Sequence, residues 1–122
     1  MADINTLAKE FTQFYYTSFD AGNDERQKLV TMYRDNSMFT FETFNLQGAS
    51  AIGQRLAEFP FQRIKHDPQT IDPQPVDGNS VLIMVTGDVY TDDDPPKKFS
   101  QVFLLKNDNG YFLYNDIFRL VL

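Results

Sequence analysis

Near its start the chain carries apolar side chains at intervals of three and four, the period of one face of an α-helix. These residues are Ile4, Leu7, Ala8, Phe11, Phe14, Tyr15 and Phe19. Asp3 precedes them and is suited to cap a helix, because its carboxylate accepts hydrogen bonds from the free N–H groups of a first turn. Gly22 is a natural end point. The pattern predicts one helix between Asp3 and Gly22.

Two shorter helices are expected before residue 61. Residues 24–27 resemble a capping box, and the helical period continues to Tyr33, which predicts a helix ending near Asn36. Helical spacing returns in residues 49–59, and Pro60 ends it, because the residue before a proline is disfavoured in helical conformation. The sequence therefore predicts three helices in its first half.

Alternating apolar and polar residues predict strands elsewhere. Two short strands, around Phe39–Phe41 and Phe44–Leu46, are expected to form a hairpin. Four longer strands are expected near residues 61–72, 80–91, 98–106 and 111–121. Asn109-Gly110 predicts a two-residue hairpin loop between the last two. Helices followed by a strand meander indicate an α+β fold with a mainly antiparallel sheet, in a single domain spanning residues 1–122.

Both faces of the long strands are apolar. In residues 81–90, Val81, Ile83, Val85 and Val89 share one face, and Leu82, Met84 and Tyr90 share the other. In the last strand, alternation groups Leu113 with Ile117 and, on the opposite face, Phe112 with Phe118. A sheet with one solvated face alternates cleanly, so a second cover is expected beyond the helices. An identical subunit supplies it most simply, which predicts a homodimer formed through the sheet.

Charge and composition narrow the function. The 122 residues include 17 acidic and 11 basic side chains, and the net charge of −6 argues against nucleic-acid and anionic membrane partners. The chain has no cysteine and one histidine, so disulfides and thiolate metal sites are excluded and a zinc site is disfavoured. No apolar run approaches a membrane span and no glycine-rich phosphate loop is present. We expect a soluble intracellular protein with no metal and no cofactor.

His66, followed by Asp67, is the one candidate general base. If it faced a cavity with a carboxylate behind it, it could abstract a proton. The alternative is a histidine that is hydrogen-bonded to a neighbouring side chain for structural reasons. One titratable residue does not make a catalytic constellation, so we favour the structural interpretation and predict no catalytic residue.

The acidic run Asp92-Asp93-Asp94, before Pro95-Pro96, is the densest charge in the sequence. It is either a solvated tip that protects a sheet edge or a docking site for Lys and Arg side chains of a partner. Metal binding is less favoured, because calcium loops space their ligands alternately around a glycine.

Aromatic residues gather near one acid, Glu42. They are Phe39, Phe41, Phe59 and Phe61. Alternating aromatics usually belong to a core, but an open apolar pocket with an acid at its rim could hold an aromatic side chain of another protein. The residues alone leave both interpretations open.

Several motifs, in order along the whole chain, resemble the nuclear transport factor 2 family: FTQFYY (11–16), FTFE (39–42), LQG (46–48), FPFQ (59–62) and NDIFRL (115–120). The resemblance implies a cone-shaped α+β fold, in which helices and a strongly curved sheet enclose a cavity, and a homodimer. It also implies a non-enzymatic carrier that takes the GDP form of the small GTPase Ran from the cytoplasm to the nucleus. Such a carrier is enriched at the nuclear pore, where it binds phenylalanine-glycine repeats of nucleoporins.

The resemblance also assigns roles to individual residues. Basic residues of Ran would pair with Glu42, Asp92 and Asp94. An aromatic side chain of Ran would enter a cavity lined by Phe41, Phe59, Phe61 and Ile64. Nucleoporin repeats would contact Ile4 and Phe118.

Two positions depart from the family pattern. Phe41 stands where the family often has Trp, and Ile4 stands where it usually has an aromatic residue. The wider superfamily includes dehydratases and isomerases, so an enzyme that uses His66 in the cavity is the alternative.

Overall fold

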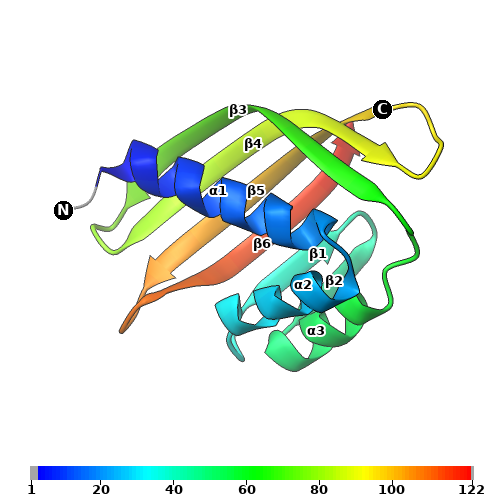
Figure 1. Ribbon diagram of the computed structural model, residues 1–122. Helices are drawn as coiled ribbons and strands as arrows, with labels where there is room; N and C mark the ends of the chain where they lie inside the picture. The colour runs from blue at the N-terminus through cyan, green and yellow to red at the C-terminus, as the bar shows by residue number, and fades with distance from the viewer. Residues whose placement is uncertain (1–2, 122) are drawn as a thin grey trace.

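The computed structural model describes residues 3–121, in which α1 (Ile4–Asp20) lies across one face of a six-stranded sheet (Figure 1). The Asp3 side chain accepts a hydrogen bond from the Asn5 backbone N–H at 3.0 Å, which confirms the predicted cap. The buried face of α1 carries Ala8, Phe11, Thr12, Tyr15, Tyr16, Ser18 and Phe19. Among the described residues, no helix is long and apolar enough to cross a membrane.

The second predicted helix is wrong in its extent. The structure has a short α2 (Asn23–Gln27) followed by a 3₁₀ helix, η1 (Lys28–Met32). No side chain caps α2, because Gly22 occupies the cap position at φ +110° and the expected capping box does not form. The chain becomes extended at Tyr33, whose hydroxyl reaches the core carboxylate of Asp116 at 2.7 Å, and this ends the helical segment before Asn36.

The sheet matches the predicted class. Its strands are β1 (Met38–Phe41), β2 (Phe44–Gln47), β3 (Ile64–Val76), β4 (Ser80–Thr91), β5 (Lys97–Asn107) and β6 (Tyr111–Val121), and α3 (Ala49–Ala57) follows β2. The strand order is β2-β1-β6-β5-β4-β3, and every neighbouring pair is antiparallel except β1 with β6. The first hairpin turns through Glu42 and Thr43, as expected.

The predicted facing of β6 is wrong at one residue. Leu105 pairs with Leu113 but Leu104 pairs with Asn115, so β6 contains one additional residue at this point. Such a β-bulge inverts the side-chain alternation that follows it. Leu113 is therefore fully buried on the same side as Phe118, whereas Ile117 is 44% exposed on the opposite face.

The predicted two-residue loop before β6 is also wrong. Asn107 pairs with Tyr111, which leaves three residues in the loop. Both Asn109 and Gly110 have positive φ, and the Asn107 side chain accepts a hydrogen bond from the Gly110 N–H at 3.2 Å. The turn signal was located correctly, but one more residue belongs to the turn.

Curvature of the sheet has a local cause. The β3–β4 register shifts between Pro68 and Thr70, so β3 contains a bulge there. Gly87 lies opposite, and a Cβ at this position would lie 2.1 Å from the Asp67 carbonyl oxygen. The strands approach each other closely only because Gly87 has no side chain. This supports the curved sheet of the cone fold.

Among the described residues, one carboxylate, that of Asp116, is fully buried in the core. Asp116 accepts hydrogen bonds from the hydroxyls of Tyr15 (2.9 Å) and Tyr33 (2.7 Å) and from the Gln101 amide (2.7 Å). Tyr16 in turn donates to Gln101 at 2.7 Å. Burial raises the pKa of Asp116 from 3.8 to about 6, and the hydrogen bonds that favour its charged form offset burial only in part.

The outer face of the sheet is apolar, as the two-faced strands predicted. Met84 of β4 pairs with Val102 of β5, which pairs with Ile117 of β6, so these side chains form one row across three strands. Leu82 and Leu104 form a second row beside it. Met84 and Ile117 are 46% and 44% exposed, and the helices pack on the other face.

Candidate aromatic-binding pocket

An apolar pocket of about 50 Å³ opens between the sheet and the segment that precedes β3. Its lining consists of Phe41, Phe61, Ile64, Val89, Thr91, Lys97, Phe118 and Leu120. Half of these are inward-facing residues of β4 and β6 near the ends of the strands. Only Thr91 and Lys97 bring polar atoms, so the pocket suits an apolar guest.

Stacked aromatic rings form the wall of the pocket. Phe41 and Phe118 are partners in the parallel β1–β6 ladder, and their rings stack with centroids 4.6 Å apart. The rings of Phe59 and Phe41 meet edge to face, with their centroids 5.0 Å apart, and Phe59 is 8% exposed. Phe41, Phe61 and Ile64 thus line the pocket as expected, whereas Phe59 supports the wall without reaching the cavity.

Glu42 is held at the rim by the backbone. It follows Phe41 in the β1–β2 turn at φ +55°, and its N–H donates to the Phe118 carbonyl at 3.0 Å. One carboxylate oxygen then accepts a hydrogen bond from the Leu120 N–H. The side chain continues the parallel ladder in place of a backbone carbonyl. This fixes a carboxylate between two residues that line the pocket, Phe41 and Leu120.

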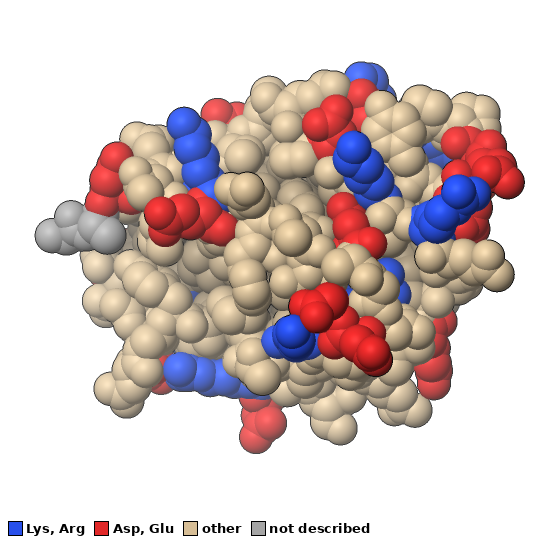
Figure 2. All heavy atoms as spheres, in the orientation of Figure 1, with Lys and Arg blue, Asp and Glu red and all other residues tan. Residues whose placement is uncertain are grey.

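The acidic run forms the exposed loop between β4 and β5, residues 92–96. Asp92 accepts hydrogen bonds from the backbone N–H groups of Gln62 (3.2 Å) and Arg63 (2.9 Å), and Asp93 forms a salt bridge with Arg63 at 2.8 Å. Acidic and basic side chains gather at the right-hand edge of Figure 2, where Figure 1 has this loop. The loop is therefore tied to the segment that carries Phe61.

The two residues expected to contact nucleoporin repeats lie far apart. Phe118 is 2% exposed and belongs to the pocket wall. Its ring contacts the ring of His66, whose centroid lies 5.3 Å from that of Phe19, near the end of α1. Ile4 is half-buried at the start of the same helix. At 1.5 Å per residue, Ile4 and Phe19 are about 22 Å apart along the helix axis.

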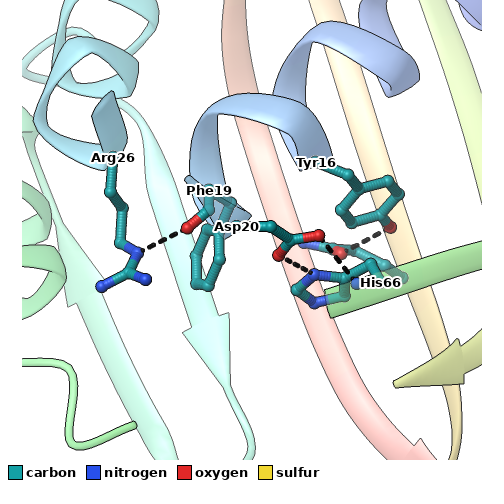
Figure 3. A network of polar contacts seen from close by, with 6 residues as sticks. Tyr16, Phe19, Asp20, Arg26 and His66 are labelled. Atoms are coloured by element: carbon teal, nitrogen blue, oxygen red, sulfur yellow. Dashed lines mark hydrogen bonds and ion pairs between the residues drawn. The ribbon is translucent and has the colours of Figure 1, made fainter. Parts of the chain in front are cut away.

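His66 has a carboxylate beside it but no place in the pocket lining. Its ring Nδ1 lies 2.8 Å from an oxygen of Asp20, and its backbone N–H donates to the other oxygen at 2.7 Å. The ring stacks on Tyr16 and meets the edges of Phe19, Phe99 and Phe118. The side chain is 2% exposed. This geometry matches the structural interpretation of His66 (Figure 3).

Sequence reasoning missed several members of the site. Lys97 lies at the pocket next to Val89, its partner in the β4–β5 register, and was not among the predicted site residues. Leu120, near the end of the last predicted strand, also lines the pocket and was not among the predicted site residues. The signal for both was alternation, counted back from Phe99 to Lys97 in β5 and forward from Phe118 to Leu120 in β6, because every second residue lies on the same face.

Comparison with known proteins identifies the family. A sequence model described as "Nuclear transport factor 2 (NTF2) domain" matches residues 7–120. Nuclear transport factor 2 of Saccharomyces cerevisiae is 50% identical over 121 residues, covering 97% of this chain and 94% of the relative. The Schizosaccharomyces pombe protein of the same name is 47% identical over 123 residues and covers 98% of both chains.

Solved structures agree with the sequence relatives. Nuclear transport factor 2 from Cryptosporidium parvum superposes with a TM-score of 0.88 at 37% identity, covering 97% of this chain and 94% of the other. The motifs, the cone fold and the relatives thus agree over almost the whole length. The chain belongs to the nuclear transport factor 2 family, and its role is that of a nuclear transport carrier.

Proposed function

We propose that this carrier binds the GDP form of Ran and takes it from the cytoplasm into the nucleus. The observation that supports this most is the apolar pocket with a carboxylate held at its rim: Phe41 and Phe118 form the wall, and Glu42 is bonded to the Leu120 N–H. An aromatic anchor in an apolar pocket provides affinity, whereas charges around it set orientation and speed encounter.

The pocket constrains how a guest enters. Its volume of about 50 Å³ is well below the roughly 150 Å³ of a cavity that holds benzene. A ring therefore seats partly in the mouth, or Phe61 moves aside. Phe61 is half-buried and lies outside any helix or strand, in the segment before β3, so it is the aromatic wall residue that we expect to move. Discrimination between GDP and GTP is then indirect, through the shape of the Ran segment that carries the ring.

The acidic residues around the mouth of the aromatic pocket have different roles. Asp92 directs one oxygen at the N–H groups of Gln62 and Arg63, so it holds the loop before β3 as well as presenting charge. Asp94 is exposed and forms no salt bridge with the described residues. We assign direct pairing with basic residues of Ran chiefly to Glu42 and Asp94, and a mixed role to Asp92.

The remaining parts of the proposal concern assembly and the pore. The apolar row of Met84, Val102 and Ile117, in which Met84 and Ile117 are exposed and Val102 is half-buried, supports a homodimer through the outer face of the sheet. Phenylalanine-glycine repeats of nucleoporins would bind a surface that includes Ile4. Phe118 would contribute to this binding from its buried position in the pocket wall. The protein would then be found in cytoplasm and nucleus, enriched at the pore, and would catalyse no reaction.

Two substitutions of Glu42 test the proposal. Glu42→Gln keeps an oxygen that accepts from the Leu120 N–H but removes the charge, and Glu42→Lys removes both. We expect each to weaken Ran-GDP binding by about tenfold or more, with thermal stability retained in Glu42→Gln. Glu10→Gln, an exposed acid on α1, is the matched control. Unchanged affinity in Glu42→Gln and Glu42→Lys would contradict the proposal.

A further inference from the structure

A second cleft, of about 370 Å³, lies beside the aromatic pocket. Phe61 belongs to both linings, so the two spaces adjoin at this residue. The second cleft differs in chemistry, because its lining includes the polar side chains of Asn23, Arg26 and Gln62. It lies where α2 begins and where the chain runs from α3 towards β3.

Arg26 is unusual because it is a buried cation. The residue is 3% exposed, and its guanidinium lies 4.8 Å from the ring centroid of Phe19 and 5.3 Å from that of Phe59. Its Nε donates to the Phe19 carbonyl at 2.9 Å, and Nη1 donates to the Asn23 side chain at 3.0 Å. These contacts fix the orientation of the guanidinium and leave Nη2 without a hydrogen bond to residues 3–121.

Arg26 lacks a directly paired acid, although the more distant Asp20 carboxylate favours its charged form. It forms no salt bridge with any carboxylate of the described residues. The Asp20 carboxylate is engaged by the N–H and the ring of His66, and Phe19 lies between Arg26 and Asp20 in Figure 3. Burial lowers the pKa of Arg26, as expected for a cation removed from water.

A buried charge is stable only when paired or solvated. Here the guanidinium lines an open cleft with part of its donor set free. The planar fork of arginine matches a carboxylate with two parallel hydrogen bonds, and the rings of Phe59 and Phe61 bound the same cleft. The free donors and the bounding rings suit an anion from outside the chain.

We propose that this cleft is a carboxylate-binding subsite, in which Arg26 pairs with an acidic side chain of the partner whose aromatic residue enters the neighbouring pocket. The proposal rests on the function proposed above, because the shared wall at Phe61 implies that one peptide segment spans both spaces. It adds a requirement to the partner. Beside its aromatic anchor and its basic residues, the partner presents an acid on the Arg26 side of Phe61.

The first test uses the free protein and acetate as the probe. At constant ionic strength, the Arg26 Nε–H signal in a nuclear magnetic resonance titration should shift to saturation. The signal of Arg34, which already pairs with Asp108 at 3.6 Å, should not. Asn23→Asp places a carboxylate on Nη1 within the chain and should abolish the shift. A response of Arg26 no larger than that of Arg34, or one retained in Asn23→Asp, would overturn the site.

The second test uses the sign of a charge effect on Ran-GDP binding. Gln62 is exposed at the cleft, so changing its charge leaves the core intact. If an acid binds there, Gln62→Glu should weaken binding and Gln62→Lys should strengthen it, each by about threefold to tenfold. The opposite order, or no effect, would refute the carboxylate subsite while wild-type binding upheld the carrier function. If the wild-type protein did not bind Ran-GDP at all, the proposed carrier function would be wrong. The acetate titration would still show whether Arg26 binds a carboxylate in the cleft.

Discussion

Phe41 and Phe118 stack with ring planes 3° apart and centroids separated by 4.6 Å. The two residues are 77 positions apart in the chain and meet because β1 joins β6 in the one parallel pair of the sheet. The pairing extends the wall of the pocket from the last strand to the first hairpin. It also delivers Glu42, the next residue, to the rim. The wall and the acid at the mouth therefore depend on the same strand pairing.

Removing the Phe41 ring should damage binding and, to a smaller extent, the fold. Phe41→Ala deletes a stacked ring and should weaken Ran-GDP binding by about tenfold or more, while costing about 2–4 kcal/mol of unfolding free energy. Calorimetry and urea unfolding measure the two effects. Phe14→Ala, a 46% exposed ring on α1, is the control and should change neither greatly. Full affinity in Phe41→Ala would show that the pocket is not the binding site.

The buried carboxylate gives stability a defined pH dependence. The pKa of Asp116 is about 6 in the folded protein against 3.8 ordinarily, so the folded state binds more protons between these values. Its contribution to the unfolding free energy is full below about pH 4 and declines as the pH rises through 6. The loss is on the order of 2–3 kcal/mol, since one pKa unit corresponds to about 1.4 kcal/mol.

Asp116→Asn isolates that contribution. Asparagine cannot titrate. Its NH₂ group would also face the donating amide of Gln101 or a tyrosine hydroxyl, so the variant should have a lower free energy of unfolding than the wild type at acidic pH. The stability advantage of the wild type over Asp116→Asn should shrink between pH 4 and pH 7 in urea titrations. Asp67→Asn, at an exposed acid, is the control for the loss of one carboxylate. An advantage that grows with pH would contradict the raised pKa.

Gly87 should tolerate no side chain. An alanine Cβ would lie 2.1 Å from the Asp67 carbonyl oxygen and 2.9 Å from the Pro68 Cα, both backbone atoms of the bulged strand. Gly87→Ala should therefore cost about 2–3 kcal/mol as the strands separate. Chemical denaturation measures this, with Ser100→Ala on β5 as control. Wild-type stability in Gly87→Ala would mean that the close approach at the bulge does not exist.

The exposed row on the sheet should control assembly. Light scattering at micromolar concentration should give the wild type about twice its chain mass of 14.1 kDa. Ile117→Glu puts a charge at the β6 end of the row, on a side chain that is 44% exposed, and should yield monomers that remain folded. Phe14→Glu, on the helical side, should remain dimeric. A monomeric wild type would exclude the homodimer.

Local patterns predicted much of the fold. Asp3 caps α1, and Glu42-Thr43 turns the first hairpin, because both depend on a few adjacent residues. The bulge in β6 was not predictable in this way. Strict alternation gave Leu113 the face of Ile117, and only the pairing with β5 reveals the additional residue.

The candidate site was predictable in part for the same reason. Phe41 and Glu42 are neighbours in sequence, so a ring beside an acid could be anticipated. The burial of Asp116 depends on donors from Tyr15, Tyr33 and Gln101, which only the tertiary fold brings together. Arg26 lies in the polar stretch of residues 23–27, which gave no sign that its side chain would be buried. Its enclosure by two rings follows from the turn at Gly22, which no periodicity encodes.

The most direct test of the carrier function is a calorimetric titration of the wild-type protein with Ran loaded with GDP and, separately, with GTP. We expect binding to the GDP form at one Ran per subunit and no measurable binding to the GTP form. Equal affinity for both forms would contradict the nucleotide-dependent carrier, and no binding to either would leave the pocket and its acidic rim without the proposed partner.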